Sequence, residues 1–435
     1  MSQLMQPQKQ PLKQPQKRSP LAMRCTVNRA NLKPNSGTSV YVAVDLTPSA
    51  ASIAGRTRNI SLAIDSSGSM DGEKIEQAKA AALGLVKQLR PTDQISIISF
   101  SDDVKVQLPT SRAGNSREAE AAVRAISVRG LTAMYEGLEA ASKQARAASK
   151  EPGSVNRVLL LTDGNPTVGR TAEKEFVSLA QGMREAGITI TAIGIGTDYN
   201  ESLLQKVAES GGGMWHHIKD GKSDLPQIFA EQVAQMAGTV VANPELKVAI
   251  MPGAELADAY RVRPVLNRLP RPRYDEGVFT IPLKDLIAGE EQTLVFRIGV
   301  PGRPASKAPL LRFSLVEVVQ DVQVTFTDDP RLVNAETDPY PRTLLSSAEA
   351  TVLMQRAVQT NEAGAMQKAE TIMRSIAADA GAAAAARANP ALNEVVTTMR
   401  DAQATVARSG LKLGEAAKKD FLQATTIIGK KKPRR

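Results

Sequence analysis

Cysteine, aromatic residues and long apolar runs are all scarce in this 435-residue sequence. The single cysteine, Cys25, excludes a disulfide within the chain. Because aromatic residues make up only 3% of the total, stacking platforms for single-stranded nucleic acid are not expected to dominate. No run approaches the roughly 20 apolar residues of a membrane helix. Residues 1–20 are basic but lack the apolar core of a secretory signal, so we expect a cytoplasmic protein.

Acidic residues are nearly missing from the two ends of the chain. Residues 1–24 carry five Lys or Arg and no acid, and residues 418–435 carry seven against Asp420. The formal net charge of +10 therefore lies in these ends, and the rest of the chain is close to neutral. Since no basic face of a folded domain is implied, contact with nucleic acid or membranes is not expected to be the main function.

The central part of the chain alternates short apolar runs with amphipathic segments. From Ile75 to Leu89 apolar residues recur at steps of three and four, which predicts a helix. The apolar runs are continuous, as in strands buried on both faces: Ile60–Ile64, Ile95–Phe100, Val158–Leu161 and Ile188–Ile195. This rhythm predicts an α/β domain over residues 56–238, with a doubly wound, mostly parallel sheet covered by helices on both faces.

Segments on both sides of this domain show the two-residue period of half-buried strands. Residues 40–46 alternate before it, and residues 246–250, 294–300 and 322–326 alternate after it. The early strands have no partners of their own before the α/β domain begins. We therefore expect residues 23–55 and 239–336 to form one β-sandwich into which the α/β domain is inserted.

The remaining stretches are helical or basic. Residues 337–429 are rich in Ala, Met and Gln, which predicts a small α-helical domain with helices near 346–360, 363–380, 392–408 and 414–427. The tract Ala382–Ala386 fits either close helix packing or a loose linker. Residues 1–22 and 430–435 are predicted to be basic tails, the first of them disordered.

Three polar loops fall at equivalent strand ends of the α/β domain: the first and third follow apolar strands, and the second precedes a helix. They are Asp65-Ser66-Ser67-Gly68-Ser69, Gly130-Leu131-Thr132 and Thr162-Asp163-Gly164. Ligands of parallel sheets bind beyond the carboxyl ends of the strands. We therefore expect five side chains to converge there: Asp65, Ser67, Ser69, Thr132 and Asp163.

Two carboxylates and three hydroxyls form an all-oxygen donor set. Such a set suits a hard divalent cation, Mg²⁺ first and Mn²⁺ or Ca²⁺ as alternatives, rather than zinc. With hydroxyls and waters as its direct ligands, the ion keeps much of its charge and can accept an outside oxygen. The natural outside donor is an Asp or Glu of a protein partner.

These loops resemble the metal-ion-dependent adhesion site of von Willebrand factor A (VWA) domains. The resemblance covers residues 56–238 and implies a Rossmann-like fold. It also implies direct ligation by Ser67, Ser69 and Thr132, with Asp65 and Asp163 acting largely through waters.

One loop departs from the family pattern, which commonly has Gly-Gly-Thr where this chain has Gly130-Leu131-Thr132. This departure does not remove the Thr132 hydroxyl.

The layout of the segments that flank the α/β domain resembles bacterial proteins related to calcium-activated chloride channel regulators and inter-alpha-trypsin inhibitor heavy chains, most specifically over residues 283–291.

These features predict a metal-ion-dependent protein-binding module that acts as an intracellular adaptor or scaffold and is not an enzyme. The alternative is a VWA subunit of a MoxR or magnesium-chelatase-like AAA ATPase assembly, with the ATPase on a separate chain because no Walker motif is present. A hydrolase using Asp65 as nucleophile would need a second acid two residues on, where Ser67 stands. It would also need a base, and no His lies in the three loops.

Two other motifs have less specific interpretations. His216 and His217 would point to opposite faces of a strand, so they are not expected to share a metal and have structural or surface roles. Gly194-Ile195-Gly196 begins like a dinucleotide-binding loop, but Tyr199 stands where the third glycine belongs. Asp198 and Asn200 are expected to cap the next helix instead.

Overall fold

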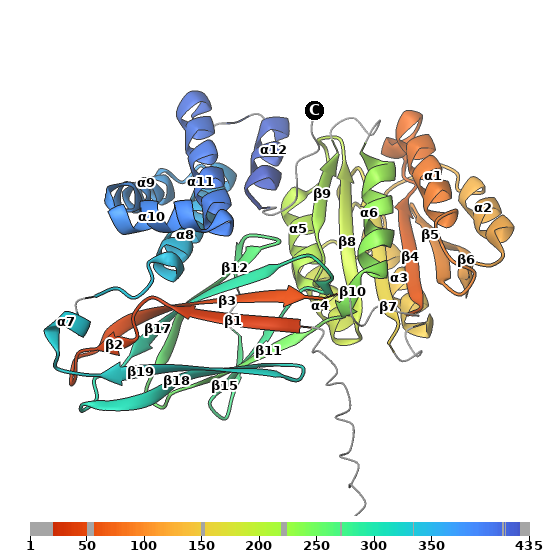
Figure 1. Cartoon of the computed structure of the whole chain (residues 1–435). Coiled ribbons are helices and arrows are strands. Elements are labelled where there is room, and N and C mark those ends of the chain that lie inside the picture. The colour runs from red at the N-terminus through yellow and green to blue at the C-terminus, as the bar shows by residue number, and fades with distance from the viewer. Residues whose placement is uncertain are drawn as a thin grey trace, which may run out of the picture.

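The computed structural model describes residues 21–49, 56–148, 153–218, 224–269, 272–333, 335–410, 413 and 415–426. Figure 1 shows three parts: an α/β unit, a β-sandwich beside it, and a helical region that lies on the sandwich and approaches the α/β unit through its last helix. This arrangement confirms the predicted fold class. The predicted tails lie outside the described residues, apart from Leu21 and Ala22.

The α/β unit is built on a six-stranded sheet with the order β6-β5-β4-β7-β8-β9. All neighbours pair in parallel except β5 and β6. The edge strand β6 was not predicted, although Val104, Val106 and Leu108 alternate with other residues. The strands are β4 (Arg58–Asp65), β5 (Gln94–Phe100), β6 (Val104–Arg112), β7 (Val155–Thr162), β8 (Ile188–Ile195) and β9 (Trp215–Ile218).

Helices cover both faces of this sheet. One face carries α1 (Glu73–Val86), α2 (Ser116–Arg124) and α6 (Leu225–Ala237), and the other carries α3 (Met134–Ala148), α4 (Glu173–Glu185) and α5 (Glu201–Ser210). In β4, Leu62 belongs to the core under α1, and Ala63 belongs to the core under α3. Burial on both faces explains why these strands are continuous apolar runs.

The sandwich combines strands from before and after the α/β unit. In one sheet β3 pairs with β17, with Val42 opposite Phe296 and Val44 opposite Leu294. That sheet contains β1 (Leu21–Val27), β3 (Thr38–Pro48), β17 (Gln292–Val300), β12 (Glu255–Arg263) and β13 (Asn267–Arg268). The other contains β14 (Arg273–Asp275), β15 (Val278–Pro282), β11 (Glu245–Ile250), β18 (Ser306–Leu315), β19 (Val318–Phe326) and β2 (Asn31–Leu32).

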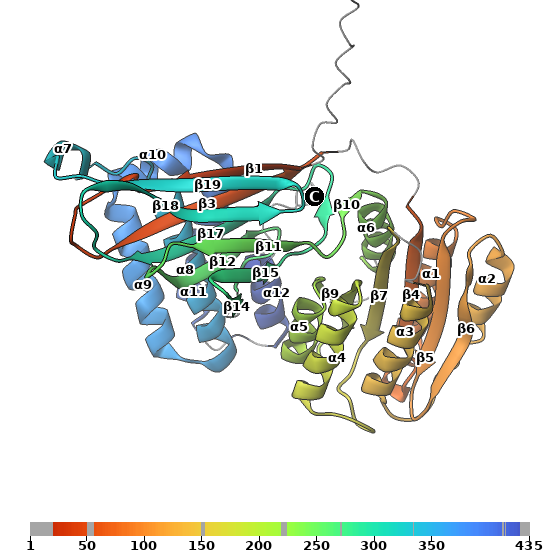
Figure 2. The same ribbon diagram turned by 90° about the horizontal axis from the view of Figure 1, so that it is seen from below.

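The sandwich begins at Leu21, two residues before the predicted boundary, because both Leu21 and Met23 pack into its core. A two-stranded ribbon of β10 (Thr239–Val241) and β16 (Leu286–Ile287) follows α6. Figure 2 shows the sandwich and the α/β unit side by side, with α6 and β10 between them.

The helical region covers the outer face of the β3–β17 sheet. Leu344 and Ala348 of α8 (Tyr340–Thr360) belong to the same core as Ala43 and Val295. This helix begins six residues before the predicted start, where the Asp338 carboxylate accepts the backbone N–H of Tyr340 at 2.9 Å. The other helices are α7 (Pro330–Val333), α9 (Ala363–Ala378), α10 (Ala380–Ala388), α11 (Pro390–Ser409) and α12 (Glu415–Thr426).

The alanine tract 382–386 lies within α10, and Ala382 and Ala385 are buried. Close helix packing is therefore the correct one of the two interpretations. Among the described residues, no helix is both long enough and apolar enough to cross a bilayer.

The last helix holds the α/β unit through a buried ammonium group. Lys419 of α12 donates to the backbone oxygens of Thr197 at 2.5 Å and Tyr199 at 3.2 Å, and its Nζ lies 3.9 Å from the centre of the Tyr199 ring. Tyr199 Oη and His217 Nδ1 share a hydrogen bond of 2.7 Å. Since His216 and His217 are both buried, their role is structural and not at the surface.

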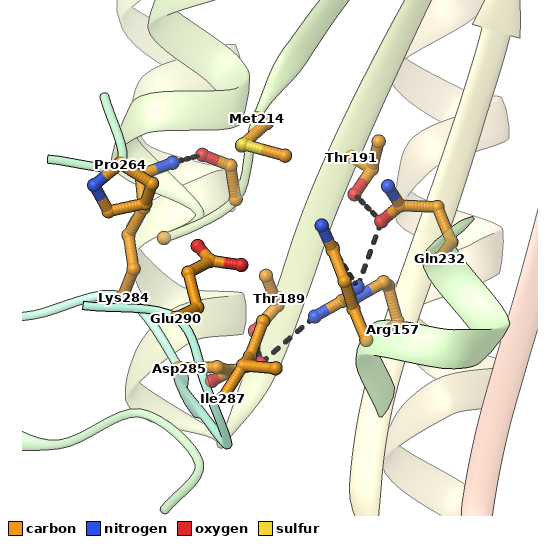
Figure 3. Close-up of a pocket in the computed structure, with 13 residues that line it drawn as sticks. Arg157, Thr189, Thr191, Met214, Gln232, Pro264, Lys284, Asp285, Ile287 and Glu290 are labelled. Carbon is orange, nitrogen blue, oxygen red and sulfur yellow. Dashed lines mark hydrogen bonds and ion pairs between the residues drawn. The ribbon is translucent and has the colours of Figure 1, made fainter. Parts of the chain in front are cut away.

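Buried charges join the α/β unit to the sandwich (Figure 3). Arg157 of β7 donates from Nη2 to Asp285 Oδ2 at 3.0 Å, and Asp285 Oδ1 accepts the backbone N–H of Asn243 at 2.9 Å. Beside this pair lies a cavity of about 30 Å³, which has room for water but not for an organic ligand. Lys284 lies in the wall of this cavity. Burial, assisted by the Arg261 guanidinium, holds the pKa of the Lys284 ammonium well below its usual range.

Candidate metal centre

The three predicted loops meet at the carboxyl ends of β4 and β7. Strand β4 ends at Asp65 and leads through a short 3₁₀ turn, Gly68–Met70, into α1. The backbone N–H of Gly68 donates to the carbonyl of Gly130 at 2.9 Å, and the N–H of Arg129 donates to the carbonyl of Ser66 at 2.8 Å. These bonds hold the Asp65 loop against the Thr132 loop.

Four of the five predicted side chains form one hydrogen-bonded network. The hydroxyl oxygens of Ser67 and Ser69 lie 3.2 Å apart, and Ser69 donates to Asp163 Oδ1 at 2.7 Å. Asp65 Oδ1 accepts the backbone N–H of Ser67 at 2.8 Å, and Asp65 Oδ2 accepts the hydroxyl of Thr162 at 2.5 Å. Thr162 thus holds the Asp65 carboxylate in place.

Thr132 supplies the fifth side chain from the remaining loop. A Cβ placed on Gly164 would lie 3.6 Å from Ser69 Oγ and 3.9 Å from Thr132 Oγ1, so both hydroxyls line one space that this glycine leaves open. The backbone N–H of Thr132 donates to the hydroxyl of Thr167 at 2.9 Å. The structure therefore brings all five predicted side chains to one end of the sheet.

The cluster combines two buried carboxylates with an opening to solvent. Asp65 and Asp163 are fully buried, whereas Ser69 is exposed and opens the cluster to solvent. Burial raises the pKa of Asp65 to about 6, against the lowering effect of the hydrogen bonds from Ser67 and Thr162. Because two buried carboxylates and three hydroxyls are all hard oxygen donors, the residues fit Mg²⁺, Mn²⁺ or Ca²⁺.

A metal site of the zinc type is not found elsewhere in the described residues. No group of three or more His, Cys, Asp or Glu side chains there could hold an ion. The hydroxyl-rich cluster is accordingly the candidate metal centre of this chain, and the ligand role of each residue in it stays a prediction.

The turn that supports the Thr132 loop was not predicted from the sequence. Asp102, between β5 and β6, accepts the backbone N–H of Leu131 on Oδ1 at 2.7 Å. The Arg129 guanidinium donates from Nε to the hydroxyl of Ser101 at 2.9 Å. Both contacts join loops that are distant in the sequence, so no local pattern indicates them.

Lys74 in the first turn of α1 was not predicted as part of the site either. Its Nζ pairs with Asp163 Oδ2 and donates to the backbone oxygen of Ser69 at 3.2 Å. The spacing of five residues from Ser69 could have indicated this contact, because the loop leads directly into the helix.

Gly130→Ala is expected to distort the Thr132 loop. Gly130 has a φ of +57°, and a Cβ there would lie 1.6 Å from Asp102 Oδ2, so the carboxylate would have to leave the N–H of Leu131. We expect a loss of about 2–3 kcal/mol in the free energy of urea unfolding, together with weaker Mn²⁺ binding.

The matched control is Gly289→Ala, because Gly289 has a φ of +76° and nothing within 4 Å of its Cβ position. The free energy of unfolding of this variant should fall by only about 1 kcal/mol, the cost of an alanine in a left-handed conformation, and its Mn²⁺ binding should be normal. Equal losses in the two variants would contradict a specific role for the Asp102 contact.

The parallel-rich sheet with three polar loops at one end defines an α/β domain class, and comparison with known proteins names it. The sequence profile of the von Willebrand factor type A domain matches residues 59–231. Over 250 residues the chain is 29% identical to the uncharacterized protein YfbK of Escherichia coli (strain K12). This alignment covers 57% of this chain and 43% of YfbK. Over 196 residues it is 31% identical to the human inter-alpha-trypsin inhibitor heavy chain H4. That alignment covers 42% of this chain and 21% of the heavy chain.

A solved structure of von Willebrand factor type A from Catenulispora acidiphila shares the fold over most of the molecule. It has a TM-score of 0.75 and 21% sequence identity, and the superposition covers 94% of this chain and 97% of that one. The chain spans less than half of YfbK and about a fifth of the heavy chain. Residues 59–231 are a VWA domain, and the similarity to YfbK and to the heavy chain agrees with the predicted resemblance to bacterial VWA proteins and inter-alpha-trypsin inhibitor heavy chains.

Proposed function

We propose that this chain is a metal-ion-dependent protein-binding module that works as an adaptor or scaffold in the cytoplasm. Ser67, Ser69 and Thr132 hold a divalent cation, with Mg²⁺ preferred over Mn²⁺ and Ca²⁺. Asp65 and Asp163 supply the balancing charge. An Asp or Glu side chain of a protein partner completes the coordination from the solvent side.

The observation that carries this proposal is the convergence of three hydroxyls over two buried carboxylates. Neutral hydroxyls donate little charge, so an ion ligated by them stays electrophilic toward an anionic oxygen. The exposed Ser69 leaves the approach to the ion open.

The rim of the site fits an acidic partner with apolar neighbours. Leu131, beside Thr132, is 52% exposed. On the loop after Asp163, the guanidinium carbon of Arg170 lies 4.8 Å from the centre of the Tyr135 ring, and Arg170 is exposed. The apolar Leu131 side chain beside Thr132 and the exposed positive charge of Arg170 favour a carboxylate carried on a protein surface over a small free acid.

A non-enzymatic role is part of the proposal. The loops at 65–70, 129–134 and 161–167 contain neither His nor Cys. His216 and His217 lie in β9, and the Nδ1 of His217 bonds to Tyr199 rather than to the cluster. The three loops therefore offer oxygen ligands for an ion, but neither a histidine base nor a cysteine nucleophile.

Ser67→Ala tests this function by capture of partners on the immobilised full chain. The variant loses one direct ligand while Asp65 keeps its bond to the backbone N–H of residue 67, so the fold should survive. We expect at least a 10- to 100-fold loss of Mg²⁺ affinity, to order of magnitude. Proteins that wild type retains in Mg²⁺ and releases in chelator should be absent from the variant.

Ser306→Ala is the matched control, because that hydroxyl is exposed on the sandwich and bonds only to the nearby carbonyl of Pro304. It should capture the same proteins as wild type. Partners that stay bound in chelator and to Ser67→Ala would overturn the proposed function.

A further inference from the structure

Lys74 occupies a position that helix stability alone does not favour. It is the second residue of α1, after Gly72 at the N-cap and Glu73. The positive end of the helix dipole lies there, and it disfavours a cation by a few tenths of a kcal/mol to about 1 kcal/mol. The candidate metal centre provides a contact that offsets this cost.

The ammonium of Lys74 engages the buried carboxylate of the cluster directly. It pairs with Asp163 Oδ2 and also donates to the backbone oxygen of Ser69 at 3.2 Å. The other oxygen, Oδ1, accepts the Ser69 hydroxyl at 2.7 Å, so both oxygens of Asp163 have partners. The Lys74 side chain is 34% exposed and the Asp163 side chain is fully buried, so the ammonium reaches the carboxylate from the solvent side.

Lys74 changes the charge that a divalent ion meets. Asp65 and Asp163 bring two negative charges, and Lys74 cancels one of them. With a divalent ion added, the cluster keeps one net positive charge. Without Lys74, the ion and the two carboxylates would balance, and the attraction for a further anion would be weaker.

We propose that Lys74 is a built-in competitor of the divalent ion: it weakens ion binding in the free protein and leaves a positive charge that a partner's carboxylate neutralises. This inference rests on the proposed function and specifies its regulation. Metal and partner then bind cooperatively, and each raises the affinity for the other by the same factor. The adaptor holds its ion tightly only when an acidic side chain is present.

Lys74→Met tests the proposal with Mn²⁺ as the ion and acetate as the carboxylate probe. Calorimetry and the loss of the free Mn²⁺ electron paramagnetic resonance signal report ion binding in sodium acetate and in sodium chloride of equal ionic strength. Without acetate, we expect the full-length variant to bind Mn²⁺ about tenfold or more tightly than wild type. Acetate should raise the affinity of wild type by a larger factor than that of the variant.

Two further variants isolate the charge. Lys74→Arg keeps it and should behave like wild type, and Lys74→Gln should follow Lys74→Met, which covers the case in which one neutral variant folds poorly. Lys143→Met is the matched control, because Lys143 pairs with Glu139 at 2.7 Å on the exposed face of α3 and should leave Mn²⁺ binding unchanged.

The outcomes separate this inference from the function on which it rests. If wild type binds Mn²⁺ but the neutral Lys74 variants bind it equally or more weakly, the inference is wrong and the metal-dependent function stands. An equal effect of acetate on wild type and variant also overturns it. If neither wild type nor any variant takes up an ion, the proposed function itself fails.

Discussion

Asp65→Asn is expected to stabilise the metal-free protein and at the same time to abolish its uptake of a divalent ion. The pKa of Asp65 is about 6 in the folded protein, above the roughly 4 of an unfolded chain, so the folded state holds this proton more tightly. Its stability therefore falls as the pH rises from about 4 through about 6, and stays reduced above that. The uncharged Asn avoids this loss and can still accept the N–H of Ser67.

The measurement is urea unfolding at pH 8, with chelator and with excess Mg²⁺. In chelator, Asp65→Asn should be more stable than wild type by about 1–3 kcal/mol. Saturating Mg²⁺ should stabilise wild type by about 2.7 kcal/mol at 100 times the dissociation constant, and should leave the variant unchanged. A variant that is less stable in chelator, or that still gains stability from Mg²⁺, would refute the assignment of Asp65.

Asp285→Ala is expected to destabilise the contact between the VWA domain and the sandwich by about 3–5 kcal/mol, because it leaves the buried Arg157 without its counter-charge. The backbone N–H of Asn243 loses its acceptor as well. Denaturant unfolding followed by the fluorescence of Trp215, which lies in the VWA sheet, measures this loss.

Asp321→Ala removes a carboxylate of the same kind from an exposed pair. Asp321 accepts two bonds from Arg312, at 2.7 and 2.9 Å, on the surface of the sandwich. Because solvent screens such a pair, we expect little or no change in stability. If the two substitutions had equal effects, the Arg157–Asp285 pair shown in Figure 3 would not be a main link between the VWA domain and the sandwich.

Much of the fold could be predicted from the sequence because its strands are buried in different ways. Strands covered by helices on both faces, such as β7, contain continuous apolar runs, and sandwich strands with one exposed face, such as β19, alternate. The early strand β3 could be assigned to the sandwich because it had no earlier partner. The start of α8 was placed too late: the bond from the Tyr340 N–H to Asp338 is local, but the hydrogen bond from the Tyr340 hydroxyl to Asp45 depends on the folded chain.

The candidate site could be predicted as a set of residues but not as a balance of charges. Asp65, Ser67 and Ser69 are close in the sequence, and Thr132 and Asp163 were expected beside them because their loops fall at equivalent strand ends and match the VWA pattern. The Lys74–Asp163 pair, the Asp102 support of the loop, and the Arg157–Asp285 link join residues that only the complete fold brings together.

The most direct test of the metal centre is a crystal structure of the full chain grown with Mn²⁺ and measured at an energy where manganese scatters anomalously. We predict one anomalous peak within about 2.6 Å of the hydroxyl oxygens of Ser67, Ser69 and Thr132. A structure at saturating Mn²⁺ without a peak among these oxygens, or with the ion bound elsewhere, would contradict the account.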